Sequence, residues 1–213
     1  MMKSIFAAFF FCILAPAFTE VFDHPLTRER QPTFQKVSRA IAAHDIQKGS
    51  FTQTKHISRL QRNLTSSGFY VISKNDGIMW QTKKPFPSTM IVSASSIVQI
   101  SASGKKNLLQ TAGNATFESF AKVIASVFQG GNELSEKNFD LYFEGREGSW
   151  SLGLIPKDKA IRAVAEKFVL EGGDFLQSVT MHEKNGDFVR YDFAGVTFPV
   201  RLTDDEKAIF ERQ

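Results

Sequence analysis

The chain has 213 residues, a formal net charge of +4 and a single cysteine, Cys12. This length suits one domain of ordinary size, which can bury a core without disulfides or metals to hold it together. The basic residues are spread along the chain and their excess is small. Nucleic acid is therefore a poor candidate partner, while a weak preference for anionic lipid surfaces stays open.

The first residues are typical of a cleavable signal peptide. Lys3 gives a basic start, residues 5–14 are apolar, and Ala15-Pro16-Ala17 forms a small-residue cleavage site. A membrane-spanning helix would need roughly 20 apolar residues, and this run is much shorter. We expect cleavage after Ala17 and a periplasmic location. Because Cys12 lies inside the apolar run, we expect a mature chain without a lipid anchor, thiol or disulfide.

The mature chain is expected to begin with a polar lead-in over residues 18–32, followed by a single domain over residues 33–213. Thr33 is the expected cap of a first helix, after which the periodicity changes from helical to alternating. Turn residues separate five predicted strands: residues 49–57, 64–73, 77–82, 89–94 and 97–102.

A second helix, begun at Asn114 or Thr116 and ended at Gly130-Gly131, is the most amphipathic of the chain. A hairpin, a short helix and three closing strands follow it, at residues 139–155, 158–165, 168–171, 175–183 and 188–193. Asp204-Asp205-Glu206 then precedes a terminal helix, where acidic side chains favour the helix N-terminus.

Many short strands in one meander, with a helix before it and another in its middle, predict the α+β class. The expected architecture is a half-open antiparallel β-barrel, a strongly curved sheet of about ten to eleven strands with helices over its concave apolar face. The 21 phenylalanines suit either a filled core or the lining of an apolar cavity, and composition does not decide between them.

The sequence offers no catalytic constellation. His24, His44, His56 and His182 have no metal-ligand spacing, and Ser151 lies in a strand pattern where a nucleophile would need a strand-to-helix turn. We therefore predict no catalytic residue, no metal site and no cofactor, and a binding protein before an enzyme.

Four segments in order, Gly49–Lys55, Leu64–Phe69, Gly77–Thr82 and Lys84–Ser88, resemble the periplasmic outer-membrane lipoprotein carrier family, the LolA-like proteins. The resemblance covers most of the mature chain, and its specific part lies within residues 49–93. It implies a monomeric carrier that holds the acyl chains of a lipoprotein, or another amphiphile, in an apolar cavity between the inner and outer membranes. Its implied partners are an inner-membrane exporter and an outer-membrane acceptor.

Apolar positions on the predicted strands supply the expected cavity walls, although a shift of one residue in register would reverse every side chain. These positions are Phe51, Phe69, Val71, Trp80, Met90 and Val92. The second helix is expected to act as a lid that fills the empty cavity, and the alternative is a helix that is simply packed on the sheet. The lid residues are Phe117, Phe120, Ile124 and Phe128.

In the family, a basic residue six positions before the tryptophan holds the lid, and here that position is Lys74. Lysine has one point donor in place of the planar fork of arginine, so this latch is expected to be weaker. Lys74 and the turn after it are similar to a divergent subgroup associated with lipid or polyene-pigment biosynthesis and export.

Two other functions stay open. A hydrolase or lyase of such a pathway would need a polar cluster inside the cavity, near His56 or His182. An envelope sensor that binds a peptide at the sheet edge would have a filled barrel.

Overall fold

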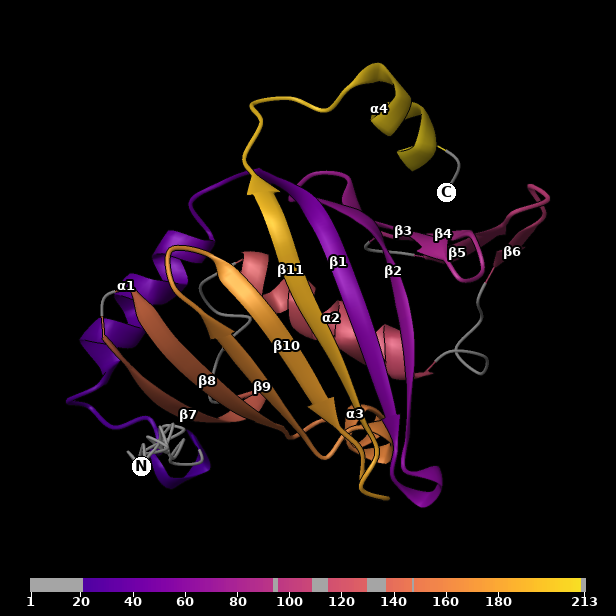
Figure 1. Ribbon diagram of the computed structural model, residues 1–213. Coiled ribbons are helices and arrows are strands. Elements are labelled where there is room, and N and C mark those ends of the chain that lie inside the picture. The colour runs from indigo at the N-terminus through magenta and orange to yellow at the C-terminus, as the bar shows by residue number, and fades with distance from the viewer. Residues whose placement is uncertain (1–20, 94–95, 109–114, 130–136, 147, 212–213) are drawn as a thin grey trace, which may run out of the picture.

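The computed structural model describes residues 21–93, 96–108, 115–129, 137–146 and 148–211. They build one antiparallel sheet of 11 strands in the order β6-β5-β4-β3-β2-β1-β11-β10-β9-β8-β7. The sheet curves strongly around helix α2, and β6 and β7 lie at its two edges (Figure 1). This is the α+β half-open barrel that the sequence predicts.

The sheet consists of two meanders. The first, which we call the N-terminal half-sheet, contains β1 (Ile46–Ile57), β2 (Arg62–Ser73), β3 (Gly77–Lys84), β4 (Ser88–Val92), β5 (Ile97–Ser101) and β6 (Lys106–Leu108). The second, the C-terminal half-sheet, contains β7 (Phe139–Arg146), β8 (Ser149–Pro156), β9 (Lys167–Gly172), β10 (Leu176–His182) and β11 (Phe188–Thr197). They join where β1 pairs with β11, so that Phe51 lies opposite Phe193.

Within the described residues, four α-helices accompany the sheet: α1 (Gln31–Ile41), α2 (Ala115–Gln129), α3 (Lys159–Val164) and α4 (Asp204–Phe210). Short 3-10 helices occupy Val21–Asp23 (η1) and Ser58–Leu60 (η2). Helix α1 begins two residues before the expected cap at Thr33, with Pro32 in its first turn. Proline is well suited to the first turn of a helix, because the backbone N–H that it lacks would have no hydrogen-bond partner there. Pro32 therefore favours the earlier start of α1.

We call the face of the sheet that carries Phe51 and Trp80 the inner face. Its side chains form one large core with residues of α1 and α2, including Phe34, Ile41 and Ile124. Strands of the C-terminal half-sheet supply six members of this core that are 0% exposed: Leu154, Phe168, Leu170, Leu176, Val179 and Met181. The expected covering of the concave apolar face by helices is therefore confirmed for α1 and α2.

A second, smaller core lies on the opposite, outer face of the N-terminal half-sheet. Phe210 of helix α4 and Leu202, just before this helix, cover it and pack with Met79 and Ile91. Thr203 accepts a hydrogen bond from the backbone N–H of Glu206, and the Glu206 carboxylate accepts one from the N–H of Thr203. This capping box explains the acidic start of the terminal helix that the sequence predicts.

The lead-in closes one edge of the sheet. Pro25 forms a β-bridge with Tyr142 of β7, and the backbone N–H groups of Leu26 and Phe143 donate to carbonyls across this contact. Phe22 packs against Gly153 of β8, where a Cβ atom would lie 2.8 Å from the Phe22 ring. The β7 edge therefore has its own partner, supplied by residues of the described lead-in.

Candidate binding site

The centre of the inner face is an aromatic cluster drawn from four neighbouring strands. The Trp80 ring lies 4.2 Å from the ring of Phe51, 5.2 Å from that of Tyr191 and 5.7 Å from that of Tyr70, between centroids. Phe193 meets Tyr70 edge to face at 5.1 Å. Such tilted and edge-to-face contacts are the favoured arrangements of aromatic pairs. These contacts make this part of the inner face a well-packed apolar surface beneath α2.

A buried polar pair lies beside the cluster. The side-chain amide of Gln47 donates a 2.8 Å hydrogen bond to the hydroxyl of Tyr70, and both residues are buried. Burial raises the pKa of Tyr70 to about 12, while the bond from Gln47 lowers it. The phenol therefore stays neutral under physiological conditions. Glycine is required opposite it, because a Cβ at Gly49 would lie 3.2 Å from the Tyr70 ring and 2.8 Å from the Ala194 carbonyl oxygen.

Four of the six residues expected to line the cavity share this inner face. Phe51 and Trp80 belong to the aromatic cluster, Met90 is the cross-strand partner of Trp80, and Val92 packs at the margin of the same core. The strand pairing brings these four together from β1, β3 and β4.

Phe69 and Val71 lie on the other side of the sheet, contrary to the expectation from sequence. Val71 pairs with Met79 and belongs to the outer core, whereas Phe69 is 53% exposed. The intervening residue, Tyr70, faces inward in their place. The cause is the uninterrupted apolar run of β2, in which no alternation marks the inner positions, so a register error of one residue goes unnoticed.

Helix α2 packs directly on the inner face. Ile124 is 0% exposed, Phe128 is 4% exposed, and both belong to the core that contains Trp80. These two of the four expected lid residues therefore contact the expected wall. The side chains of Phe117 and Phe120 lie outside the described residues.

Lys74 joins the start of the β2–β3 turn to the segment after α1. Its ammonium group donates a 2.7 Å hydrogen bond to the carbonyl oxygen of Ala42 and lies 3.2 Å from the Asp45 carboxylate. The backbone N–H of Lys74 also donates to the Asp45 carbonyl. A cation near a helix C-terminus interacts favourably with the negative end of the helix dipole. Lys74 thus ties down the C-terminal end of α1, and both of these partners precede β1.

The two histidines near which a hydrolase or lyase would need its polar cluster, His56 and His182, lie away from the aromatic cluster. Phe188 is paired with both His56 and His182, and all three side chains lie on the outer face. The His56 ring stacks on Phe188 at 5.0 Å and bonds Asn63. Among the described residues, no three His, Cys, Asp or Glu side chains are grouped to hold a metal. His56 and His182 therefore lie on the face opposite the aromatic cluster.

Ser151 lies in the middle of β8, paired with Glu144 and Glu171, on the face opposite Trp150, Leu152 and Leu154. These three neighbours are buried in the inner core. The prediction that this segment is an ordinary strand is confirmed.

Accessibility of the inner face increases toward β5. In β9 and β10 the inner side chains of Leu170 and Met181 are fully buried. Met90 of β4 is 7% exposed, and Val92 and Ile97 are half-buried at the margin of the core. An apolar ligand that enters beneath α2 would therefore meet the least covered apolar side chains in β4 and β5.

The sequence did not identify three aromatic residues of this face, Tyr70, Tyr191 and Phe193. The pairing of the strands would have identified them, because it places their strands beside those that carry Phe51 and Trp80.

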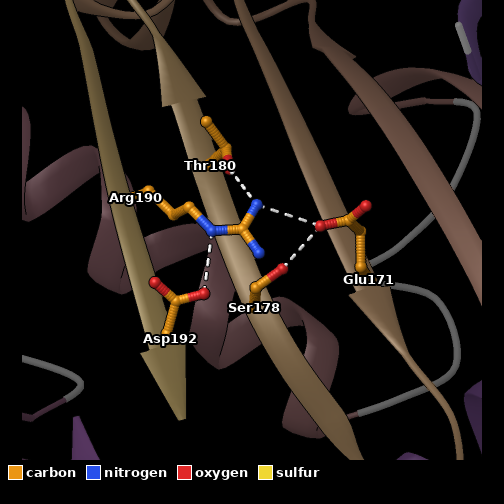
Figure 2. A network of polar contacts seen from close by, with 5 residues as sticks. All are labelled: Glu171, Ser178, Thr180, Arg190 and Asp192. Atoms are coloured by element: carbon orange, nitrogen blue, oxygen red, sulfur yellow. Dashed lines mark hydrogen bonds and ion pairs between the residues drawn. The ribbon is translucent and has the colours of Figure 1, made fainter. Parts of the chain in front are cut away.

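The outer face of the C-terminal half-sheet carries a polar network in place of a core (Figure 2). Arg190 Nε donates to Asp192 at 2.8 Å, and its Nη1 donates to Glu171 at 3.1 Å and to Thr180 at 3.4 Å. Ser178 adds a 2.8 Å hydrogen bond to the same Glu171 oxygen. Burial lowers the pKa of Arg190, but Asp192 and Glu171 outweigh it and raise the pKa. The guanidinium stays charged and links β9, β10 and β11.

The sequence of this chain is similar to that of one known protein family. The sequence model described as outer membrane lipoprotein carrier protein LolA matches residues 44–209. No curated protein matches. Within the described residues, no helix has the length and apolar character needed to cross a membrane.

Solved structures with a similar fold have little sequence in common with this chain. A LolA superfamily protein from Nitrosomonas europaea is 10% identical, covers 82% of this chain and 95% of its own, and has a TM-score of 0.49. A DUF1329 family protein from Desulfovibrio piger is 10% identical over 81% of this chain and 95% of its own, with a TM-score of 0.47. The MucA/MucB complex of Pseudomonas aeruginosa matches at 11% identity over 84% of this chain and 60% of that one, with a TM-score of 0.44.

Proposed function

This chain belongs to the LolA family of outer membrane lipoprotein carriers, and from that premise we propose that it carries an acylated lipoprotein, or another amphiphile, across the periplasm. The observation that carries the proposal is the aromatic inner face beneath α2, with its least covered apolar residues in β4 and β5. Residues 1–17 serve as its cleavable signal peptide. The mature chain is a monomer that exchanges cargo with an inner-membrane exporter and an outer-membrane acceptor.

The acyl chains bind by replacing α2. Ile124 and Phe128 pack into the same core as Trp80, so an incoming chain must displace their contacts. Burial of each methylene contributes roughly 0.8 kcal/mol, and two or three acyl chains would bind far too tightly for a carrier that must release them. The lost contacts of α2 offset part of this gain. Carriage is then reversible because the helix and the ligand compete for one surface.

The walls of the binding surface are Phe51, Trp80, Met90 and Val92, the four expected residues that share the inner face. Lys74 acts on α1, whose Phe34 and Ile41 belong to the same core. Its role in this proposal is to limit the movement of α1 while α2 leaves. A single ammonium donor suits a latch that opens repeatedly, because it forms fewer fixed bonds than the fork of arginine.

Two measurements test carriage. The first is mass spectrometry of amphiphiles that co-purify with the chain after gentle extraction from the periplasm. The second is titration of the purified chain with a fluorescent fatty acid. We expect a bound acylated species in the first and saturable binding in the second. Absence of any bound amphiphile together with absence of probe binding would overturn the proposal.

A pair of variants on one strand locates the binding face. Val92 and Thr89 both belong to β4 and are both half-buried, but they lie on opposite faces. Val92→Asn is expected to weaken binding of the fluorescent fatty acid by roughly tenfold, the effect of losing about 1.4 kcal/mol, and Thr89→Asn is expected to leave it unchanged. Circular dichroism melting of both variants controls for folding. Equal losses of probe affinity would place the ligand elsewhere.

The self-plug has a separate signature. Ile124→Ala removes packing that only the empty state makes, so it is expected to tighten probe binding while it destabilises the unliganded chain. A matched truncation in the same core but outside α2, Val179→Ala, is expected to destabilise the chain without tightening binding. Weaker binding in Ile124→Ala would favour the alternative of a permanently packed helix.

A further inference from the structure

The turns between β3 and β4 and between β5 and β6 carry a concentrated positive charge. Lys83, Lys84, Lys105 and Lys106 are all exposed. Residues 77–108, which include all of β3 to β6, contain these four lysines and no aspartate or glutamate. Within the part of the chain that the structure describes, none of the four forms an ion pair. We call the exposed residues 83–87 and 105–106 the cationic tip.

The strand pairing places the two turns side by side. Thr82 pairs with Ser88 across the first turn, Ser88 pairs with Ser101 of the next hairpin, and the Ser101 N–H donates to the Lys105 carbonyl at 3.0 Å. Because neighbouring strands lie about 4.8 Å apart, the two pairs of lysines lie at the same end of the β3–β6 part of the sheet. Their mutual repulsion has no acidic neighbour in these turns to relieve it.

Two large apolar side chains accompany the charge. Phe86, between Pro85 and Pro87, is 82% exposed. Phe69 on the outer face of β2 is 53% exposed, and Lys84 pairs with Ser67, two positions before it. Diagonal neighbours on one face lie within reach of long side chains. The surface thus joins lysines to exposed phenylalanines, the combination found where proteins meet anionic lipid.

The position of the cationic tip also matters. β6 is one edge of the sheet, at the right of Figure 1, and β7 is the other. Residues 24–26 pair with β7, so that edge already has a partner. The tip lies at the opposite edge, at the end of β4 and β5 where Ser88 pairs with Ser101, whereas the half-buried Val92 and Ile97 pair at the other end of these strands.

We propose that the cationic tip docks the protein on the anionic phospholipid surface of a membrane, with its lysines at the headgroups and Phe86 inserted at the interface. A bilayer fits better than an acidic protein because Phe86, in the connection between β3 and β4, exposes 82% of its surface to solvent, with no apolar pocket of the described residues around it to shape a specific protein contact. Each lysine near an anionic surface contributes roughly 1 kcal/mol, or about fivefold in partition. This docking does not depend on acyl-chain carriage.

Vesicle co-sedimentation of the mature chain tests the docking. Vesicles that contain phosphatidylglycerol are expected to bind the chain, vesicles of phosphatidylcholine alone are expected to bind it at least tenfold less, and added salt is expected to weaken the binding. Equal binding to both lipids, or none to either, would overturn the proposal. Binding only to vesicles that contain native membrane proteins would identify a protein partner and would also overturn it.

Matched variants locate the surface. The quadruple variant Lys83→Gln, Lys84→Gln, Lys105→Gln, Lys106→Gln is expected to lose at least tenfold in vesicle binding, and Phe86→Ser several-fold. The controls are Lys159→Gln with Lys184→Gln, exposed lysines outside the tip, and Val200→Ser, a 99% exposed apolar residue beside α4. Losses as large in the controls would contradict the proposal. Fatty-acid binding measured in parallel is expected to stay unchanged, which separates failure of docking from failure of carriage.

Discussion

The two half-sheets distribute their apolar side chains differently. Along β11 the buried Val189, Tyr191 and Phe193 alternate with Arg190 and Asp192, which face solvent. Along β2, by contrast, Tyr70, Val71 and Ile72 are consecutive and all buried, because α4 covers the outer face of the N-terminal half-sheet. The C-terminal half-sheet therefore has one core and one wet face, and the N-terminal half-sheet has a core on each side.

This difference assigns structural support to the C-terminal half-sheet and ligand binding to the N-terminal half-sheet. The inner side chains of β9 and β10 are completely buried and act as a fixed base. Those of β4 and β5 are less covered, yet their strands keep their shape because the outer core and α4 hold them from behind. A sheet supported on its outer face can leave part of its inner face accessible. Stability and ligand binding should therefore respond to different substitutions.

The largest expected effect is in the base. Phe168→Ala in β9 removes a fully buried ring and is expected to lower the free energy of unfolding by about 3–5 kcal/mol. Met90→Ala in β4 is expected to cost about 2 kcal/mol, the lower end for its type, because its site is already slightly open. Urea denaturation of both variants measures the difference. Equal costs would remove the distinction between the half-sheets.

The buried pair beside the aromatic cluster gives the next effect. Tyr70→Phe leaves the buried Gln47 amide without this acceptor and is expected to cost about 1–3 kcal/mol in unfolding free energy. Adding Gln47→Leu to that variant removes both partners and is expected to recover most of the loss. A double variant less stable than Tyr70→Phe would show that Gln47 acts through contacts other than this bond.

The outer polar network is expected to matter less. Arg190→Met should lower the unfolding free energy by about 1 kcal/mol or less, because the arginine side chain is 39% exposed and solvent screens its ion pairs. The loss should shrink in high salt, and fatty-acid binding should not change. A variant with altered probe binding would connect the outer face of β9–β11 to the ligand.

The smallest effect concerns the anchor of α4 and depends on pH. Burial raises the pKa of Glu206, but the Thr203 N–H and Lys48, at 2.9 Å, outweigh it and lower the pKa. The folded state therefore favours the carboxylate, and this contribution to stability exists above the ordinary glutamate pKa and is lost as the pH falls through the folded pKa. Glu206→Gln should cost about 0.5 kcal/mol near neutral pH. In thermal melts the difference from the parent chain should begin to shrink as the pH falls below the ordinary glutamate pKa of about 4.3, and it should vanish once the pH is below the lowered pKa of the folded state.

The contrast between the half-sheets also explains what the sequence could predict. Strict alternation in β11 and the Trp150, Leu152 and Leu154 pattern of β8 determine which face is buried, so these strands and their faces are predictable. In β2 the run from Phe69 to Ile72 has no alternation, because strands buried on both faces are apolar throughout. Its register depends on pairing with β1 and β3, which a local pattern does not contain.

Two further features lay beyond local patterns. The short β6 has only three residues, too few for a period to show. The latch position was identified through the family resemblance, but its contact was not, because the partners of Lys74 depend on how α1 ends and where its connection to β1 passes. The amphipathic pattern of α2 predicted a helix with one apolar face. It did not specify which strands that face would meet.

The β1–β11 junction imposes an order on folding. Each half-sheet is assembled from hairpins between consecutive strands, whereas Ser50 and Ala194 meet although they are 144 positions apart in sequence. Local hairpins form early, and contacts between distant segments pay a large entropy of chain closure before they gain any bonds. A chain that emerges from its N-terminus can fold its first meander on its own, but with β1 as an open edge. Only the arrival of β11 closes that edge, so the complete inner face exists only after nearly the whole polypeptide has been delivered.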